Sequence, residues 1–151
     1  MTSSPTAHYR QPDWFTRNVM NRFLNRLTRL GISVWGSRTL EHVGRSTGEV
    51  HRTPVNPLTL EGHEYLVSPR GETQWVRNVK AADGKLVLIL GRRRVERTAV
   101  EIPVAERTPI LRAYLRRWKF EVGMFFDGVG PDSTDAQFEA IAAKHPVFIL
   151  R

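Results

Sequence analysis

The chain has 151 residues, 40% of them apolar and 9% aromatic, which is enough to close one ordinary hydrophobic core. It has no cysteine, which excludes disulfides, thiolate nucleophiles and cysteine-ligated iron–sulfur clusters. Twenty-three Lys and Arg against fifteen Asp and Glu give a formal net charge of +8, so the chain is expected to attract polyanions. Composition leaves three classes of partner open: nucleic acid, an anionic membrane surface, and a phosphorylated or carboxylated small molecule.

The first part of the chain divides into a polar leader and a basic amphipathic segment. Residues 1–12 have no hydrophobic periodicity, which predicts a disordered leader. Asp13 is expected to cap a helix over 13–30 that stops at Gly31. Arginines lie opposite the apolar face of this helix, so it either docks on the rest of the protein or contacts a membrane peripherally. The sequence has no apolar run of about 18 residues and no secretory signal, which predicts a cytoplasmic protein.

The middle of the chain changes to the period of strands. Residues 39–43 and 50–60 flank a glycine-rich turn as a hairpin, and Pro54 and Pro57 favour a sheet edge or a bulge for the second strand. A third strand is expected over 65–68. Helical spacing over 72–82 follows and closes at Asp83-Gly84; 86–90 is then predicted as a buried central strand, and 94–102 as a strand that pairs back on it.

The last third alternates between helices and one final strand. Thr108 is expected to cap a helix with Pro109 in its first turn, and Thr134 with Gln137 has the pattern of a capping box. That second helix is expected to end at His145-Pro146, before a strand over 147–150. Five or six antiparallel strands with peripheral helices predict an α+β protein built on a small barrel, as a single domain over 13–151.

Two turns have the composition of a phosphate site. The turn 44–48 combines two glycines with two hydroxyls and Arg45, so it offers backbone N–H groups beside a guanidinium. The stretch 68–71 leads a strand into a helix whose first amides would face a ligand. The alternative interpretations are an ordinary hairpin turn with a solvated arginine, and a Trp75 that belongs to the core.

Other classes of site have no matching motif in this sequence. The five histidines lack metal-ligand spacing, so no metal site is predicted. There is also no phosphate-binding P-loop, no dinucleotide fingerprint and no nucleophile elbow. The arginine run 92–94 is interpreted as a solvated hairpin tip rather than a nucleic-acid site.

Taken in order, the sequence 44–48, the sequence 52–54, the stretch 68–71 and the final 145–148 resemble the deazaflavin-dependent nitroreductase family, whose members use coenzyme F420 and have a split β-barrel fold. The resemblance implies that one set of residues faces the phosphate and polyglutamate tail: Arg45, Ser46, Thr47, His51 and Arg52. It implies that Thr53, Pro54 and Val55 line the deazaflavin and that the other side is closed by Ser68, Arg70, Gly71, Trp75 and Asn78. Ser46 stands where the family usually has Lys, which removes one cation from the tail site.

The resemblance also implies the chemistry. The expected reaction transfers a hydride from the reduced deazaflavin to an electron-poor acceptor such as an enone, a quinone or a nitro compound. Tyr114, Ser68 and solvent are the candidate proton donors. An apolar substrate wall or, equally, a core role is expected for Trp118, Phe120, Met124, Phe125 and Phe126.

Two other functions remain open from the sequence. One is an FMN-binding protein of the pyridoxamine-phosphate-oxidase type, which would share the barrel. The other is a basic protein that binds lipid or nucleic acid without turnover, for which DNA affinity would fall steeply with salt.

Overall fold

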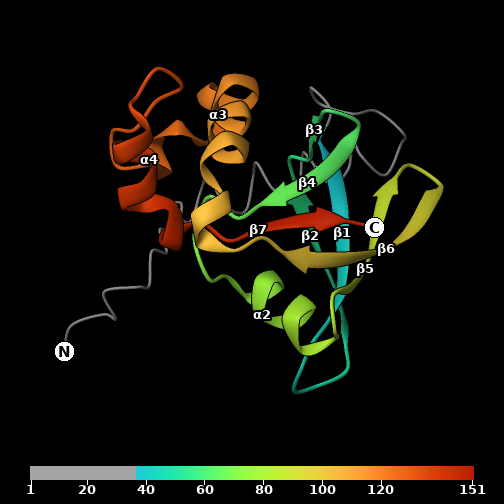
Figure 1. The fold of residues 1–151 in the computed structure, drawn as a ribbon. Helices are drawn as coiled ribbons and strands as arrows, with labels where there is room; N and C mark the ends of the chain where they lie inside the picture. The colour runs from blue at the N-terminus through green and yellow to red at the C-terminus, as the bar shows by residue number, and fades with distance from the viewer. Residues whose placement is uncertain (1–36) are drawn as a thin grey trace. The chain divides into compact units, whose positions relative to one another are not determined.

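The computed structural model describes residues 37–151, which group into two compact units. The first, called here the helical unit, consists of Leu58–Thr73 and Glu101–Ile149. The second, called the hairpin unit, consists of 37–57, Gln74–Val100 and Leu150–Arg151. The predicted leader 1–12 and the predicted helix 13–30 lie outside the described residues, and the single domain over 13–151 stays a prediction (Figure 1).

The hairpin unit is an antiparallel sheet with one helix. Its strands are hydrogen-bonded in the order β2 (Val50–Val55), β1 (Arg38–Val43), β5 (Lys85–Leu90) and β6 (Arg93–Glu101). β5 is therefore central within this unit, as its apolar sequence predicts. The helix α2 (Gln74–Ala81) packs on β1 and β5 with its apolar side. The side chains buried there include Leu40, Leu88, Trp75, Val76 and Val79.

The end of α2 requires a glycine at a fixed position. Asp83 and Gly84 have φ angles of 55° and 86°, which close the helix as the sequence predicts. The Ala99 N–H group donates to the Gly84 carbonyl at 2.7 Å, so β6 passes directly against this turn. A Cβ atom at position 84 would lie 2.2 Å from the Ala99 oxygen, and only glycine fits.

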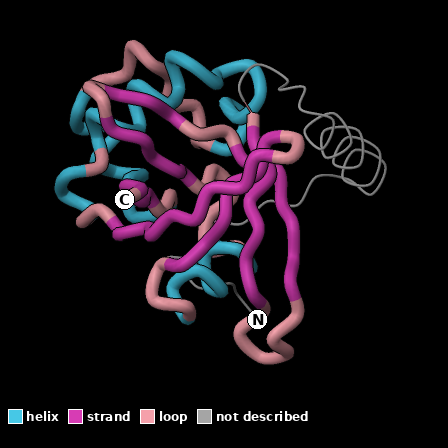
Figure 2. The backbone as a smooth tube through the Cα atoms, turned by 90° about the vertical axis from the view of Figure 1, so that its right-hand side faces the viewer, coloured by secondary structure: helices cyan, strands magenta, loops and turns pink. Residues whose placement is uncertain are grey.

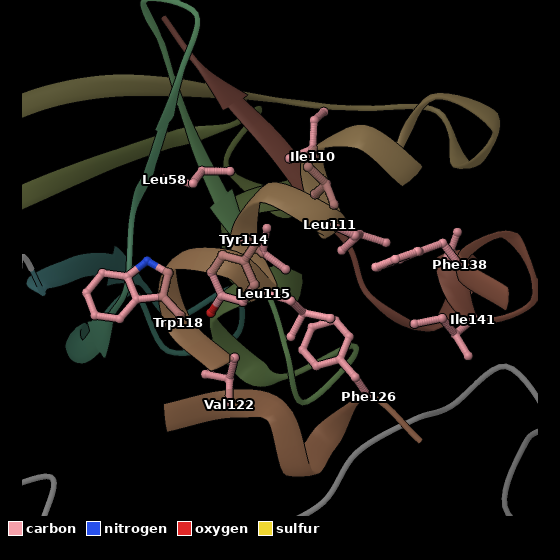
Figure 3. Packing of buried hydrophobic residues seen from close by; sticks show 13 residues of the cluster. Leu58, Ile110, Leu111, Tyr114, Leu115, Trp118, Val122, Phe126, Phe138 and Ile141 are labelled. Atoms are coloured by element: carbon pink, nitrogen blue, oxygen red, sulfur yellow. The ribbon is translucent and has the colours of Figure 1, made fainter. Parts of the chain in front are cut away.

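The helical unit combines three strands with two helices. The strands β3 (Leu58–Leu60), β4 (His63–Val67) and β7 (Val147–Leu150) pair antiparallel, with β4 between the other two. α3 (Thr108–Val122) and α4 (Asp135–Ile141) are accompanied by the short 3-10 turns η1 (Val104–Glu106), η2 (Gly123–Phe125) and η3 (Ala142–Lys144). Figure 3 shows the core of this unit, which includes Leu111, Tyr114, Leu115, Trp118, Phe126 and Phe138.

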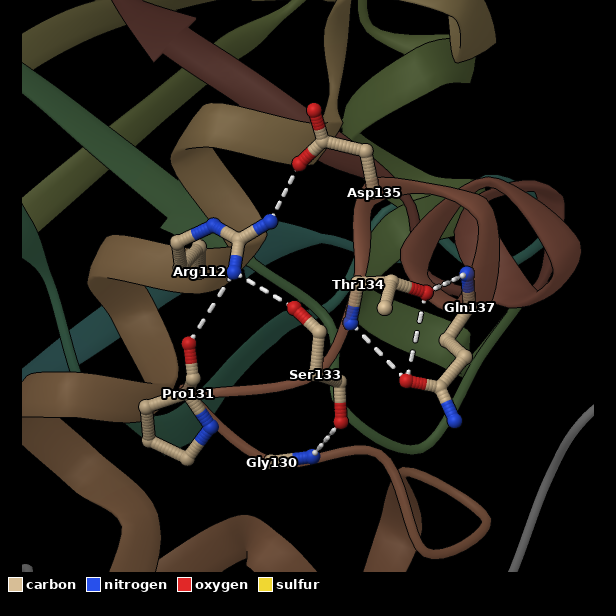
Figure 4. Close-up of polar contacts among 7 residues, drawn as sticks. All are labelled: Arg112, Gly130, Pro131, Ser133, Thr134, Asp135 and Gln137. Carbon is tan, nitrogen blue, oxygen red and sulfur yellow. Dashed lines mark hydrogen bonds and ion pairs between the residues drawn. The ribbon is translucent and has the colours of Figure 1, made fainter.

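The connection between α3 and α4 is fixed by polar contacts (Figure 4). Thr134 and Gln137 form the predicted capping box, with Thr134 Oγ1 accepting from the Gln137 N–H at 3.2 Å. Arg112 on α3 donates to the carbonyl oxygens of Pro131 and Ser133 at 3.1 and 2.7 Å and pairs with the Asp135 carboxylate. One guanidinium therefore holds the loop and the start of α4 against α3.

Three details of the sequence-based prediction are corrected. The predicted strand 50–60 is two strands, β2 and β3, because Pro57 interrupts the ladder. The described residues accordingly contain seven strands rather than five or six. Thr108 does not cap α3: Arg107 stands at the N-cap position without a side-chain cap, and its guanidinium donates instead to the carbonyl oxygen of Ile102 at 2.9 Å. Within each of the two described units the paired strands run antiparallel, which confirms the predicted α+β class.

Candidate functional site

The hairpin unit contains a cavity of about 410 Å³. Figures 1 and 2 show where its walls come from: the turn at the end of the β1–β2 hairpin lies beside α2. The cavity is lined by polar residues of both elements, which are His42, Gly44, Arg45, Ser46, Thr47, His51, Arg52, Thr53, Gln74 and Asn78. None of these lining residues is acidic, so the cavity suits an anionic ligand.

The turn between β1 and β2 is closed by its own hydrogen bonds. The Gly44 N–H donates to the Glu49 carbonyl at 2.7 Å, and the Gly48 N–H, at φ 75°, donates to the Gly44 carbonyl at 2.9 Å. Among residues 37–151, the backbone N–H groups of Ser46 and Thr47 find no acceptor. Two adjacent amides without an acceptor are a ready binding site for an anionic oxygen.

Arg45 is held against the first turns of α2. Its Nη1 atom donates to Gln74 Oε1 and to Asn78 Oδ1, both at 2.8 Å, and its backbone N–H donates to the same Asn78 oxygen at 3.1 Å. Its Nε and Nη2 groups bond to none of the described residues, which leaves them for a ligand. A guanidinium that is already oriented loses less side-chain entropy when it binds an anion.

Two histidines on neighbouring strands of the hairpin, His42 and His51, also line the cavity. His42 and His51 are paired in register, and their rings stack at a centroid distance of 5.6 Å. His42 is only 3% exposed. Burial, and after it the nearby His51, lower the pKa of His42 to about 4, so its imidazole is neutral at physiological pH.

Arg52 is the second arginine that lines the cavity, and it forms an ion pair with an acidic residue, Glu41. Its Nε atom lies 3.2 Å from Glu41 Oε2, and Arg94 reaches the other carboxylate oxygen at 2.6 Å. The hydrogen bond from Arg94, with smaller contributions from Arg52, lowers the pKa of Glu41. Because two arginines share one carboxylate, the cluster keeps a net positive charge beside the hairpin.

The structure brings some of the predicted cofactor residues together in this cavity. Seven of them line the cavity: Arg45, Ser46, Thr47, His51, Arg52, Thr53 and Asn78. Pro54, Val55 and Trp75 belong to the same unit without lining it, and Trp75 is 6% exposed, as expected for a core residue. The other three, Ser68, Arg70 and Gly71, belong to the helical unit, where the Ser68 hydroxyl donates to the Gly71 carbonyl at 2.5 Å.

The five residues predicted as a substrate wall do not share one environment. Trp118 and Phe126 are 1% and 0% exposed and form part of the core of the helical unit (Figure 3). Phe125 packs against that core, whereas Phe120 and Met124 are 89% and 66% exposed. Tyr114, a candidate proton donor, is also core, at 1% exposed. Phe120 and Met124 are therefore the members of the five most open to a ligand.

Two residues that line the cavity, His42 and Gln74, are not among the site residues predicted from the sequence, and Gly44 is predicted only as a glycine of the phosphate-binding turn 44–48. His42 had a readable signal: it is polar at an inward position of a strand, two residues after the buried Leu40.

Comparisons with known proteins identify the family to which the chain is similar. The model of the F420H(2)-dependent quinone reductase family matches residues 9–122 of the chain. A comparison with curated proteins found no match.

Solved structures show the same fold. The structure of an F420-H2 dependent reductase (FDR-A) matches with a TM-score of 0.50 and 20% identity, over 77% of this chain and 94% of that one. A structure described as a domain-swapped dimer matches with a TM-score of 0.56 and 20% identity, over 92% and 98%. Protein Atu2129 of Agrobacterium tumefaciens str. C58, of unknown function, matches with a TM-score of 0.55 and 14% identity, over 93% and 58%. These likenesses confirm the split β-barrel class.

Proposed function

The chain belongs to the F420H(2)-dependent quinone reductase family, and we propose that it binds coenzyme F420 in the cavity of the hairpin unit and reduces an electron-poor acceptor. The observation that carries the proposal is the arrangement around Arg45. Its guanidinium is fixed by Gln74 and Asn78 beside the N–H groups of Ser46 and Thr47.

The donors of this cavity fit the phosphate and carboxylate groups of the cofactor. Arg45 supplies a permanent positive charge, and Arg52 adds a second that is partly compensated by Glu41. Ser46, in place of a lysine, contributes a hydroxyl and a backbone amide but no charge. Each charge-assisted hydrogen bond contributes about 1.5–3 kcal/mol, so a few of them support binding without a lysine here.

When coenzyme F420 is bound, its reduced deazaflavin would supply the hydride. The protein would bind the cofactor, orient it and shield it from water. The reduced acceptor must also gain a proton. The Ser68 hydroxyl is engaged by the Gly71 carbonyl, and Tyr114 is buried in the core. We therefore assign this proton to solvent rather than to either side chain.

We propose quinones, enones and nitro compounds as acceptors, with quinones favoured by the family description. Phe120 and Met124 are exposed apolar side chains that suit a flat, apolar acceptor. FMN gains no support from the family match. Within residues 37–151 no helix is both long and apolar enough to cross a membrane, and peripheral contact through 13–30 stays a proposal.

The proposal is tested by fluorescence titration of the full chain with coenzyme F420, FMN and a short DNA duplex. We expect saturable binding of F420 alone. Arg45→Ala with Arg52→Ala should weaken it at least a hundredfold, because two charge-assisted bonds are lost. The matched control is Arg92→Ala with Arg93→Ala, which removes the same charge from exposed positions of the same unit outside the cavity.

Equal loss in both double variants would mean that only net charge matters and would reject the site. Wild-type binding of FMN or DNA, but not of F420, would reject the function. With F420 binding established, turnover of menadione, cyclohexenone and a nitroimidazole under reduced F420 identifies the acceptor class.

A further inference from the structure

The buried amide of Asn78 has one orientation that satisfies its neighbours. Its Oδ1 atom lies within hydrogen-bond distance of two Arg45 groups, the backbone N–H and Nη1, and both can only donate. Its Nδ2 atom therefore points the other way, 3.0 Å from His42 Nδ1. Because an amide NH₂ can only donate, His42 Nδ1 must be the acceptor and has no proton.

This contact fixes the tautomer of His42. A neutral imidazole without a proton on Nδ1 has it on Nε2. His42 Nε2 lies 3.2 Å from Thr53 Oγ1, so the ring donates to the threonine hydroxyl. The lowered pKa of His42 agrees with a neutral ring, because burial disfavours the imidazolium.

The Thr53 hydroxyl accepts a hydrogen bond from His42 and can still donate one through its own proton. Among residues 37–151 it makes no other hydrogen bond, and Thr53 lines the cavity. We propose that Asn78 and His42 are positioning residues that turn the proton of the Thr53 hydroxyl away from His42, so that the hydroxyl donates it to the ligand in this cavity. The acceptor is an oxygen or nitrogen of the ligand that has no proton.

This inference deepens the proposed function, on which it rests for its ligand. All four residues of the chain Arg45–Asn78–His42–Thr53 then have their protons directed one way, from the guanidinium towards the hydroxyl. A ligand without an acceptor opposite Thr53 would leave the threonine proton without a partner, which is the kind of mismatch that a polar site discriminates against.

The first test observes His42 directly in the free protein. A long-range ¹H–¹⁵N spectrum at pH 8 should show the His42 ring neutral, with its proton on Nε2. A purely structural histidine has no required tautomer, so a proton on Nδ1 would overturn the proposal. Asn78→Asp keeps both acceptor contacts with Arg45 but cannot donate to His42, so in this variant the proton should move to Nδ1.

The second test is a double-mutant cycle on F420 affinity. Thr53→Val keeps the shape of the side chain without the hydroxyl, and should weaken binding about tenfold in the wild-type background. In the Asn78→Asp background the Thr53 proton turns to His42 Nε2, so adding Thr53→Val should change affinity less than about twofold. The charge introduced by Asn78→Asp is present in both members of this second pair. Equal losses in the two backgrounds would overturn the proposal, and Thr53→Ser should retain binding.

The same cycle identifies which part of the ligand accepts the bond. It is repeated with the deazaflavin–ribityl fragment, which lacks the phosphate and the glutamates. If Thr53→Val weakens the binding of F420 tenfold but not that of the fragment, the acceptor lies in the phosphate or the tail. If it weakens the binding of both, the acceptor lies in the ring or the ribityl chain. Either result supports the proposal. If wild-type protein binds neither, the proposed function fails, while the His42 tautomer in the free protein still decides the positioning role.

Discussion

Arg45 and Asn78, 33 positions apart in the chain, are joined twice: the backbone N–H and the Nη1 group of Arg45 donate to the same Asn78 oxygen. The Asn78 side-chain amide thereby fixes both the backbone of the turn and the Arg45 side chain. Residues 45–49 of the turn are exposed, so without this link Arg45 would have many conformations in the free protein.

We therefore expect Asn78→Ala and Gln74→Ala to differ in their effect on F420 affinity. Gln74→Ala removes one of the three hydrogen bonds of Arg45, whereas Asn78→Ala removes two and also the donor to His42. Binding should weaken about threefold in the first and at least tenfold in the second, measured by fluorescence titration. Equal weakening would show that Asn78 has no special place in the site.

The stability of the protein should depend on His42 between about pH 6.5 and 4. The folded state holds the pKa of His42 at about 4, below the ordinary value of 6.5 expected for the unfolded chain. The unfolded state therefore binds more protons in this window, and the contribution of the neutral ring is complete above it and lost as the pH falls towards 4. The loss amounts to roughly 3 kcal/mol for the full shift.

Urea unfolding of wild type and His42→Gln at pH 7.5 and 4.5 checks this expectation. The carboxylates contribute equally to both proteins, so the difference between them isolates the histidine. The variant should lose less free energy of unfolding over this range than wild type. The same slope in both proteins would contradict the assignment.

Arg112 should contribute more to stability than its exposed ion-pair partner. Its guanidinium donates to two loop carbonyl groups (Figure 4). The guanidinium carbon also lies 4.7 Å from the centre of the Phe138 ring. Arg112→Ala should lower the free energy of unfolding by about 2 kcal/mol or more. Asp135 is 77% exposed, so Asp135→Asn should cost less than about 1 kcal/mol. Denaturant unfolding compares the two, and equal losses would place the stabilisation in the ion pair.

Alanine variants of Phe120 and Phe126 should distinguish a residue that contacts the substrate from a residue of the core. Phe126 is fully buried, so Phe126→Ala should lower the free energy of unfolding by about 3–5 kcal/mol. Phe120→Ala should leave stability nearly unchanged, because the side chain is 89% exposed. If Phe120 contacts the acceptor, this variant raises the KM for quinone while F420 affinity stays constant. An unchanged KM would remove Phe120 from the substrate site.

Local signals predicted most of the elements correctly. The apolar run of β5, the Thr134 capping box and the glycine after α2 each carry their own physical cause within a few residues. The single strand expected over 50–60 was wrong because the pattern continues through Pro57, although that residue cannot donate to a ladder. The cap expected at Thr108 was wrong because α3 already begins at Thr108, with Arg107 at the N-cap position and no side-chain cap there.

The sequence by itself determined the family, the strand and helix types and the turn with its arginine, because glycines, hydroxyls and periodicity act over short stretches of chain. Only the tertiary structure decided that Asn78 orients Arg45 and that His42 lines the cavity, since both depend on α2 packing across β1. It likewise decided that Trp118 and Phe126 are core residues while Phe120 is exposed. A residue type states which bonds a side chain can make, and packing decides which neighbours it meets.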